Sequence, residues 1–387
     1  MFTRQLGTKI QDASQMFYAV AVVGPRQSGK TTLLRHLFPD YHYLNLEDPD
    51  TLEKLKLDPR AFLSDKKKQY IIDEAQEYPD LFSFLLGIID QNKIKGQFIL
   101  SGSQNFTLME NISQSLAGRV AVLELLPLMF DELKSYGSFA EANIWKLVFQ
   151  GSYPGPNYDG VETSLWYKSY LQTYLQRDVR QVLNVRDLSQ FHLFLKLCAG
   201  RHGQLLNLSE LGSECGISHT TAKQWINILE ASYVLFRLQP YYKNFNKRLV
   251  KTPKLYFFDS GLVCHLLGIE SGEHAQLHVS RGALFEGYVV SEIAKHFYAR
   301  AKTPELYFWN HHKGFEIDVL LEKQGIPTAI EIKSSSTFSS DFLTQLKKWE
   351  KLSAQNKVTS YVIYSGTESF DIQDYHVLSY RALSKLI

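Results

Sequence analysis

The sequence has few cysteines, no long apolar run and almost no net charge. Its three cysteines, Cys198, Cys215 and Cys264, are isolated among 387 residues. They argue against a disulfide framework or a cysteine-based zinc site and predict a cytoplasmic location. No stretch is apolar over about 18 residues, and the start, MFTRQLGTKIQDASQMF, has no signal-peptide core, so we expect no membrane partner. With a formal net charge of +2, any nucleic acid would have to bind a local basic patch.

The first 130 residues alternate short apolar runs with amphipathic stretches, which is typical of an α/β sheet. The apolar runs are largely continuous, as expected for parallel strands that are buried on both faces. The expected strands are Tyr18–Val23, Tyr41–Leu46, Tyr70–Asp73, Phe98–Ser101 and Val120–Leu125.

The rest of the chain changes pattern twice. Residues 131–185 are expected to be helical, with a break at 151–156, and residues 186–275 to form a small helical module that ends in a strand pair. Residues 276–387 return to a mixed α/β pattern. A chain of this length is expected to form several domains, so we predict four, over 1–130, 131–185, 186–275 and 276–387.

Residues 24–31, GPRQSGKT, match the pattern GxxxxGK[ST] in full. They follow the apolar run Ala19–Val23 and precede a helical stretch, and these flanks argue against a plain glycine turn. Glycines let backbone N–H groups surround phosphates, Lys30 would contact the β- and γ-phosphates, and the Thr31 hydroxyl would bind Mg²⁺. The sequence therefore predicts an ATP and Mg²⁺ site built from Gly24, Pro25, Arg26, Gln27, Ser28, Gly29, Lys30, Thr31 and Thr32.

Three further segments supply candidate catalytic residues. The apolar strand YII ends in Asp73, expected to hold Mg²⁺, and Glu74, expected to orient or deprotonate the attacking water. After the next strand, Ser101 and Gln104 compete for a role at the γ-phosphate, with a polar turn as the alternative. Arg119 is a candidate charge-stabilising arginine that would act within the chain or on a neighbouring copy in an oligomer.

The segments GPRQSGKTT, IIDEAQ, LSGSQNF, SLAGRV and YLQRDVR, in this order, resemble prokaryotic AAA-type ATPases with a C-terminal domain of unassigned function. The resemblance extends through LYFFDSGL to the end of the chain. It implies an AAA-type P-loop core with a helical lid, a winged-helix module and a restriction-endonuclease-like α/β domain. It leaves the biological role open.

The segment from Leu208 to Phe258 has helix-turn-helix spacing. We expect a short helix with Ser209 as its N-cap, a second helix over 219–230, and strands at Ser232–Gln239 and Lys254–Phe258. Residues 241–254 are basic and aromatic and could bind nucleic acid. The second helix offers few base-reading side chains, so a structural lid with a solvated loop is the favoured alternative.

The last domain carries Glu286 on an expected helix, Asp318 on one strand, and Glu331 with Lys333 on the next strand. Residues i and i+2 of a strand share a face, so Glu331 and Lys333 should project together. The three carboxylates would hold a second divalent metal, and Lys333 would act on the water. The alternative is an ordinary surface ion pair. Gln345 with Trp349 resembles a Gln-x-x-x-Tyr element that follows such sites in some nucleases.

These patterns favour an ATP-dependent switch that controls a nuclease-like domain acting on nucleic acid. The second hypothesis is a regulatory ATPase whose C-terminal domain only binds a partner. A DNA-binding regulator is the weakest of the three, because the recognition helix is poorly equipped.

Overall fold

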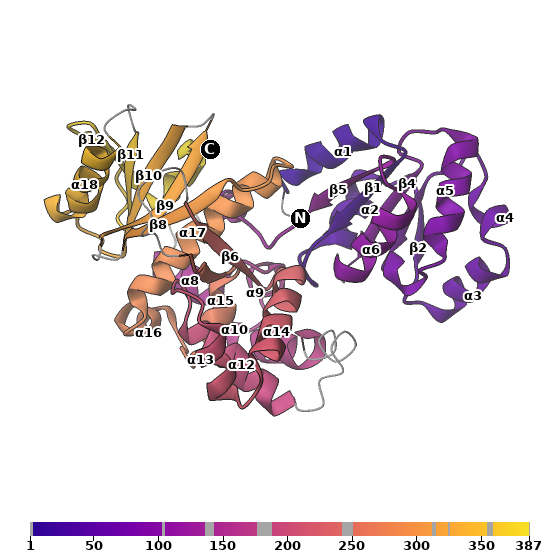
Figure 1. The fold of residues 1–387 in the computed structure, drawn as a ribbon. Coiled ribbons are helices and arrows are strands. Elements are labelled where there is room, and N and C mark those ends of the chain that lie inside the picture. Colours follow the sequence, from indigo (N-terminus) through magenta and orange to yellow (C-terminus); the bar gives the residue numbers. More distant parts are fainter. Residues whose placement is uncertain are drawn as a thin grey trace. The chain divides into compact units, whose positions relative to one another are not determined.

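The structure is a computed structural model that describes residues 3–102, 105–135, 143–175, 188–241, 251–311, 315–323, 326–353 and 359–386. The chain divides into two compact units (Figure 1). Unit 1 comprises 1–128, 231–233 and 298–302, and unit 2 comprises 129–230, 234–297 and 303–387.

Unit 1 is built on a five-stranded sheet in which every pair of neighbours is parallel, in the order β2-β3-β4-β1-β5. The strands are β1 (Ala19–Val23), β2 (His42–Asn45), β3 (Tyr70–Asp73), β4 (Phe98–Gly102) and β5 (Val120–Glu124). All five predicted strands are confirmed to within one residue at each end. The carboxyl ends of parallel strands meet at one edge of the sheet, and the residues that follow β1, β3 and β4 therefore share that edge.

Helices α1 (Leu6–Met16), α2 (Lys30–Leu37), α3 (Pro49–Leu57), α4 (Pro59–Leu63), α5 (Leu81–Asn92) and α6 (Asn105–Ser115) complete unit 1, with a 3₁₀ turn η1 (Ala75–Glu77). All five residues of β1 are buried. Val20 and Val22 pack with Ile10, Leu33 and Ile99 in one core cluster. This apolar packing on a central strand holds the loop after β1 on a rigid support.

The first part of unit 2 is helical, with α7 (Phe130–Lys134), α8 (Ile144–Gln150), α9 (Pro154–Tyr158), α10 (Thr163–Tyr170), η2 (Leu171–Leu175), α12 (Leu188–Gly200), α13 (Leu208–Cys215) and α14 (His219–Ala231). The expected break at 151–156 is shorter than predicted, because Pro154 begins α9 in the first helical turn, where its missing N–H costs nothing. The N-cap of α13 is Asn207 and not Ser209, since the Asn207 side chain accepts the N–H of Glu210. Trp225, with Ala222, Ile226 and Leu229, forms the buried face predicted for α14.

A mixed eight-stranded sheet forms the rest of unit 2, in the order β12-β13-β11-β10-β9-β8-β6-β7. Its strands are β6 (Leu235–Pro240), β7 (Lys254–Phe257), β8 (Leu306–His311), β9 (Phe315–Lys323), β10 (Ile326–Lys333), β11 (Ser360–Tyr364), β12 (Phe370–Ile372) and β13 (Tyr375–Ser379). Helices α15 (Ser260–Leu266), α16 (Gly272–Leu277), α17 (Arg281–Ala299) and α18 (Thr344–Leu352) and the 3₁₀ segments η3 (Ser340–Leu343) and η4 (Tyr380–Leu386) accompany it.

Two features of this sheet differ from the sequence-based expectation. The antiparallel pair β6–β7 was predicted, but β6 also pairs in parallel with β8. The strand pair assigned to residues 186–275 is therefore continuous with the sheet of residues 276–387. The pairing of β8 with β9 also contains a bulge, seen as a register shift between Tyr307 and Trp309 of β8. Opposite this segment, β9 has one extra residue between Ile317 and Leu320.

The predicted fold class, an α/β chain with a parallel P-loop sheet and a second α/β sheet, is confirmed. Within the described ranges, no helix is long and apolar enough to cross a membrane.

Candidate functional site

The loop between β1 and α2 has the backbone of a phosphate-binding loop. Gly24 has φ 150°, and a Cβ there would lie 2.2 Å from the carbonyl oxygen of Leu125. Gly29, which precedes the first residue of α2, has φ 91° in the left-handed region. Both positions need glycine, the first for close approach and the second for conformation. Gln27, between them, is exposed.

Lys30 folds back into this loop instead of extending into solvent. Its Nζ donates to the carbonyl oxygens of Gly24 at 3.0 Å and Pro25 at 2.9 Å, and the residue is only 6% exposed. Among the described residues, the buried hydroxyl of Ser28 has no hydrogen-bond partner. Buried hydroxyls rarely lack partners. A phosphate bound in this loop could pair with the Lys30 ammonium group and could also give the Ser28 hydroxyl a hydrogen-bond partner.

Asp73, at the end of β3, is the centre of the predicted metal site. Its Oδ2 accepts hydrogen bonds from Thr31 Oγ1 at 2.7 Å and from the Tyr43 hydroxyl at 2.8 Å. Its Oδ1 accepts from Ser101 Oγ. Thr31 and Asp73 thus meet as predicted, although they are 42 residues apart, and together they offer the hydroxyl and carboxylate oxygens that Mg²⁺ prefers. The adjacent Thr32 is exposed.

Tyr43 is a site residue that sequence reasoning missed. Burial, followed by the charge of Asp73, raises the pKa of Tyr43 above its ordinary value, so its hydroxyl stays a donor at physiological pH. The guanidinium carbon of Arg35 lies 5.0 Å from the centre of its ring. The only signal available was the position of Tyr43 on a strand next to β3.

Arg4 is a second missed residue. Its guanidinium donates to the carbonyl oxygens of Ser28 at 2.8 Å and of Leu126 at 2.6 Å. It therefore joins the phosphate-binding loop to the segment after β5. Arg26 pairs more loosely with Glu47, at 3.4 Å.

Ser101 and Arg119 both contact carboxylates. Ser101 is buried and its hydroxyl donates to Asp73, so it orients that carboxylate, and its role at the γ-phosphate stays a prediction. Gln104, its competitor, lies outside the described residues. Arg119 precedes β5 and pairs with Asp90 through two nitrogens, at 2.8 and 3.1 Å.

Arg119 also lies at the wrong edge of the sheet for a role within the chain. Its carbonyl accepts the N–H of Ala19, the first residue of β1. The phosphate-binding loop follows the last residue of β1, about 16 Å of strand away. A role on a neighbouring copy stays a prediction.

Unit 2 brings the four predicted polar groups of the last domain together. Asp318 on β9 interacts electrostatically with Glu331 and Lys333 on β10 and with Glu286 on α17. Burial, followed by the negative charges of Glu331 and Glu286, raises the pKa of Asp318 well above its ordinary value. Lys333 forms an ion pair with Glu331. These residues, with Glu316 and Lys254, are named here the carboxylate cluster.

Lys254, the last residue of the stretch 241–254 that was expected to bind nucleic acid, is instead buried and supplies a cation to this cluster. Its Nζ pairs with Glu286 at 3.2 Å and with Glu316, and the residue is 5% exposed. Burial alone would lower the pKa of Lys254, but the charges of Glu286 and Glu316 raise it above its ordinary value. The Tyr256 hydroxyl adds a hydrogen bond of 2.5 Å to Glu286.

The carboxylate cluster does not have the geometry of the second metal site that the sequence predicted. In the described part of the chain, no group of three or more His, Cys, Asp or Glu side chains is arranged to hold a metal ion. Glu286 is bonded to Lys254 and Tyr256, and Asp318 Oδ2 accepts the backbone N–H of Ile332 at 2.7 Å. Lys254 and Lys333 thus pair with the carboxylates that a metal would need as ligands. The buried Glu331 Oε2 has no hydrogen-bond partner among the described residues.

Several aromatic residues of unit 2 are part of its core. Trp309 and Trp349 are at most 2% exposed, and their rings meet edge to face at 5.3 Å. Tyr241, at the start of the basic stretch 241–254, is also buried. Residues 242–250 of that stretch lie outside the described residues.

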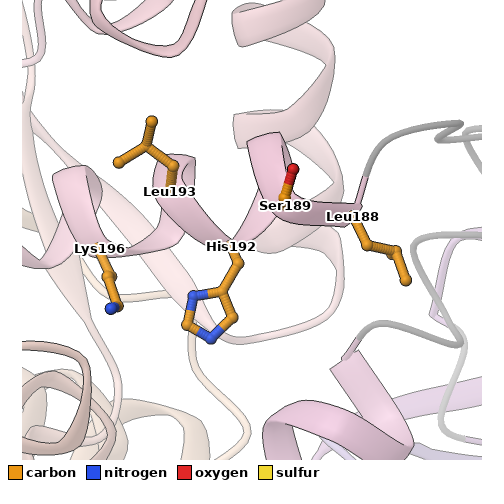
Figure 2. A pocket seen from close by; sticks show the side chains of 5 residues that line it. All are labelled: Leu188, Ser189, His192, Leu193 and Lys196. Carbon is orange, nitrogen blue, oxygen red and sulfur yellow. The ribbon is translucent and has the colours of Figure 1, made fainter.

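One further cavity lies on α12. It has a volume of about 500 Å³ and is lined by Leu188, Ser189, His192, Leu193 and Lys196 (Figure 2). None of the predicted site residues lines it.

Comparison with known proteins supports this description. Residues 17–134 match the model of an AAA domain, residues 141–273 a domain of unknown function (DUF8612), and residues 281–383 a domain of unknown function (DUF4143). The uncharacterized protein Rv2008c of Mycobacterium tuberculosis is 32% identical over 339 residues, which cover 86% of this chain and 74% of that protein. The chain belongs to the family of Rv2008c.

Other known proteins match this chain with lower sequence identity. The uncharacterized protein MJ1637 of Methanocaldococcus jannaschii is 24% identical over 363 residues, 79% of this chain and 71% of that protein. Among solved structures, the Walker-type ATPase PABY2304 of Pyrococcus abyssi matches with a TM-score of 0.45 and 14% identity, over 69% of this chain and 96% of that chain. The AAA domain match and the parallel sheet of unit 1 identify this part of the Rv2008c family member as an AAA-type P-loop ATPase core.

Proposed function

We propose that unit 1 binds ATP with Mg²⁺ and hydrolyses it. The observation that carries the proposal is the joining of Thr31 to Asp73 beside a phosphate-binding loop that already encloses the Lys30 ammonium group. Lys30 would hold the β- and γ-phosphates, and the hydroxyl of Thr31 and the carboxylate of Asp73 would hold Mg²⁺. Bound Mg²⁺ supplies charge neutralisation at the phosphates. Glu74, next to Asp73, would accept a proton from the attacking water.

Two substitutions test binding and hydrolysis separately. Lys30→Ala should weaken ATP binding by at least about tenfold, or about 1.4 kcal/mol, in calorimetry, whereas Lys9→Ala, an exposed lysine of α1, should leave it unchanged. Glu74→Gln should bind ATP normally and hydrolyse it far more slowly, because it keeps the shape but loses the proton acceptor. Unchanged affinity in Lys30→Ala would refute the assignment of the site.

We propose further that the nucleotide state of unit 1 regulates unit 2, and that the carboxylate cluster favours a partner-binding role over a nuclease. The supporting observation is Lys254, whose ammonium group pairs with two of the carboxylates. Binding of a divalent metal would require these ion pairs to break, and the buried ammonium group of Lys254 would then lose its compensation.

A cleavage assay decides between these roles. Labelled single- and double-stranded DNA and RNA are incubated with the protein and Mg²⁺ or Mn²⁺, with and without ATP. We expect no cleavage from the wild type. Cleavage that is lost in both Asp318→Ala and Lys333→Ala would establish the nuclease alternative instead.

A further inference from the structure

We propose that Gln76 is the positioning residue of Glu74, and that Gly102 is glycine because the Gln76 amide occupies the space of its side chain. The Gln76 amide would hold the Glu74 carboxylate in one orientation for the attacking water. This inference rests on the proposed ATPase activity, and it names residues that the P-loop motif and its paired acids do not include.

The backbone brings Gln76 back to Glu74. Glu74 has φ 52° and ψ 47°, a left-handed conformation that is uncommon for a residue with a side chain. It lies between β3 and η1, and its carbonyl oxygen accepts the N–H of Glu77 at 3.0 Å. In this tight turn Gln76 Nε2 lies 2.5 Å from Glu74 Oε2.

The contact is built into the core of unit 1. Gln76 is 5% exposed, and Ala75 beside it is fully buried. An amide N–H that donates to a carboxylate oxygen stabilises the ionised, proton-accepting form of the acid. The reversed amide would place Gln76 Oε1 against the carboxylate and repel it, so the contact also fixes which end of the amide faces Glu74.

Gly102 gives an independent reason to assign Gln76 this role. A Cβ at Gly102 would lie 2.4 Å from Gln76 Oε1 and 2.9 Å from Leu108 Cδ2. Gly102 is not among the described glycines with positive φ, so its backbone does not require glycine. What excludes a side chain here is the space taken by the Gln76 amide and by Leu108.

Adjacent residues of β4 therefore serve the adjacent acids of β3. Ile72 pairs with Leu100, and beyond this pair Ser101 donates its hydroxyl to Asp73. One residue further, Gly102 makes room for the amide that holds Glu74. The end of β4 thus arranges both carboxylates of the proposed site.

The test uses the full chain and measures kcat and KM for ATP hydrolysis. Gln76→Met keeps the volume but removes the amide, and we expect kcat to fall at least about tenfold with KM changed less than about twofold. A residue that only supports the fold would not separate kcat from KM in this way. Gly102→Ala should have the same effect, and Gly87→Ala, whose Cβ would have a nearest neighbour at 3.9 Å, is its control.

A double-mutant cycle makes the inference specific. Gln76→Ala empties the space beside Gly102 and leaves only the contact with Leu108 Cδ2 at 2.9 Å, so Gly102→Ala should cost less activity in Gln76→Ala than in the wild type. Additive losses, or an unchanged kcat in Gln76→Met with ATP binding intact, would overturn the role of Gln76 and leave the ATPase proposal standing. A wild type that binds ATP without turnover would instead overturn the proposed hydrolysis, and this inference with it.

Discussion

At the scale of single residues, several donors hold the carboxylate of Asp73, the proposed Mg²⁺ ligand, in place. Three hydroxyl groups from three elements hold it, from Thr31 on α2, Tyr43 on β2 and Ser101 on β4. These donors fix the direction of both carboxylate oxygens.

Tyr43→Phe should raise the Mg²⁺ concentration needed for half-maximal ATP hydrolysis severalfold. The ring and its contact with Arg35 remain, but Asp73 loses one of its fixed donors. We also expect the free energy of unfolding to fall by about 1 kcal/mol, the usual net value of one hydrogen bond. A Mg²⁺ titration of activity checks this, with Tyr41→Phe as the matched control, and equal titrations of both variants would contradict it.

The predicted site residues that the structure brings together in unit 1 are those whose location follows from adjacent sequence. The phosphate-binding loop and the pair Asp73–Glu74 are contiguous segments, and strand and helix flanks fix their location. Tyr43 and Lys254 contact partners 30 and 32 residues away, so only the strand order and packing reveal them. Arg119 precedes a parallel strand and therefore lies at the amino edge of the sheet, so its position does not support the role predicted for it within the chain.

At the scale of secondary-structure elements, unit 2 depends on pairings that local pattern does not specify. The strand β10 pairs with β11, which lies about thirty residues later in the sequence. The strand β6 pairs with β8, although β7 and three helices, α15 to α17, lie between them in the sequence. Alternating apolar residues predicted β9 and β10 individually, but not which strands lie beside them. The bulge in β9 likewise depends on its partner β8.

The turn after α12 links two such elements through His202. The N–H of Phe257 on β7 donates to His202 Nδ1 at 3.2 Å, and a Cβ at Gly287 on α17 would lie 1.7 Å from Nε2. Complete burial lowers the pKa of His202 to about 3. In the unfolded chain its pKa is near the ordinary value of about 6.5.

Stability from this histidine should therefore be lost as pH falls below about 6.5. Between the two pKa values the unfolded chain binds the proton and the folded chain does not, so ∂ΔG/∂pH is positive. We expect His202→Gln to remove about 1 kcal/mol of the stability difference between pH 7 and pH 5.5. Denaturant unfolding at both pH values checks this, and His219→Gln, an exposed histidine at the start of α14, should leave the difference unchanged.

Other buried groups in unit 2 titrate in the opposite sense, which is why the variant must be compared with the wild type. Burial raises the pKa of Asp259 above its ordinary value, and the same holds for Asp318. Such acids take up protons on folding, so their contribution to stability falls as pH rises. A pH dependence that is identical in wild type and His202→Gln would show that His202 is not buried as a neutral ring.

At the scale of the whole molecule, the two units are connected more than once. The chain passes between them after Leu128, Glu230, Tyr233, Phe297 and Lys302. If a single linker joined the two units, each could unfold alone. Because the chain passes between them several times, the unfolding of one unit should disturb the segments that belong to the other. This connectivity gives a physical basis for the proposed regulation of unit 2 by nucleotide.

The tryptophans allow this coupling to be measured without a label. The chain has five, at positions 145, 166, 225, 309 and 349, and all of them belong to unit 2, whereas the proposed ATP site belongs to unit 1. Tryptophan fluorescence during thermal unfolding therefore reports unit 2 alone. ATP at 100 times its Kd stabilises the state that binds it by about 2.7 kcal/mol.

We expect ATP with Mg²⁺ to raise the midpoint of the tryptophan transition by several degrees, because unit 2 cannot unfold without disturbing the unit that holds the nucleotide. Lys30→Ala should abolish the shift when its midpoint with ATP is compared with its own midpoint without ATP, which separates nucleotide binding from a general salt effect. The opposite result is equally clear. If calorimetry shows ATP binding and the tryptophan midpoint does not move, the two units unfold independently, and nucleotide-dependent regulation of unit 2 loses the coupling that it requires.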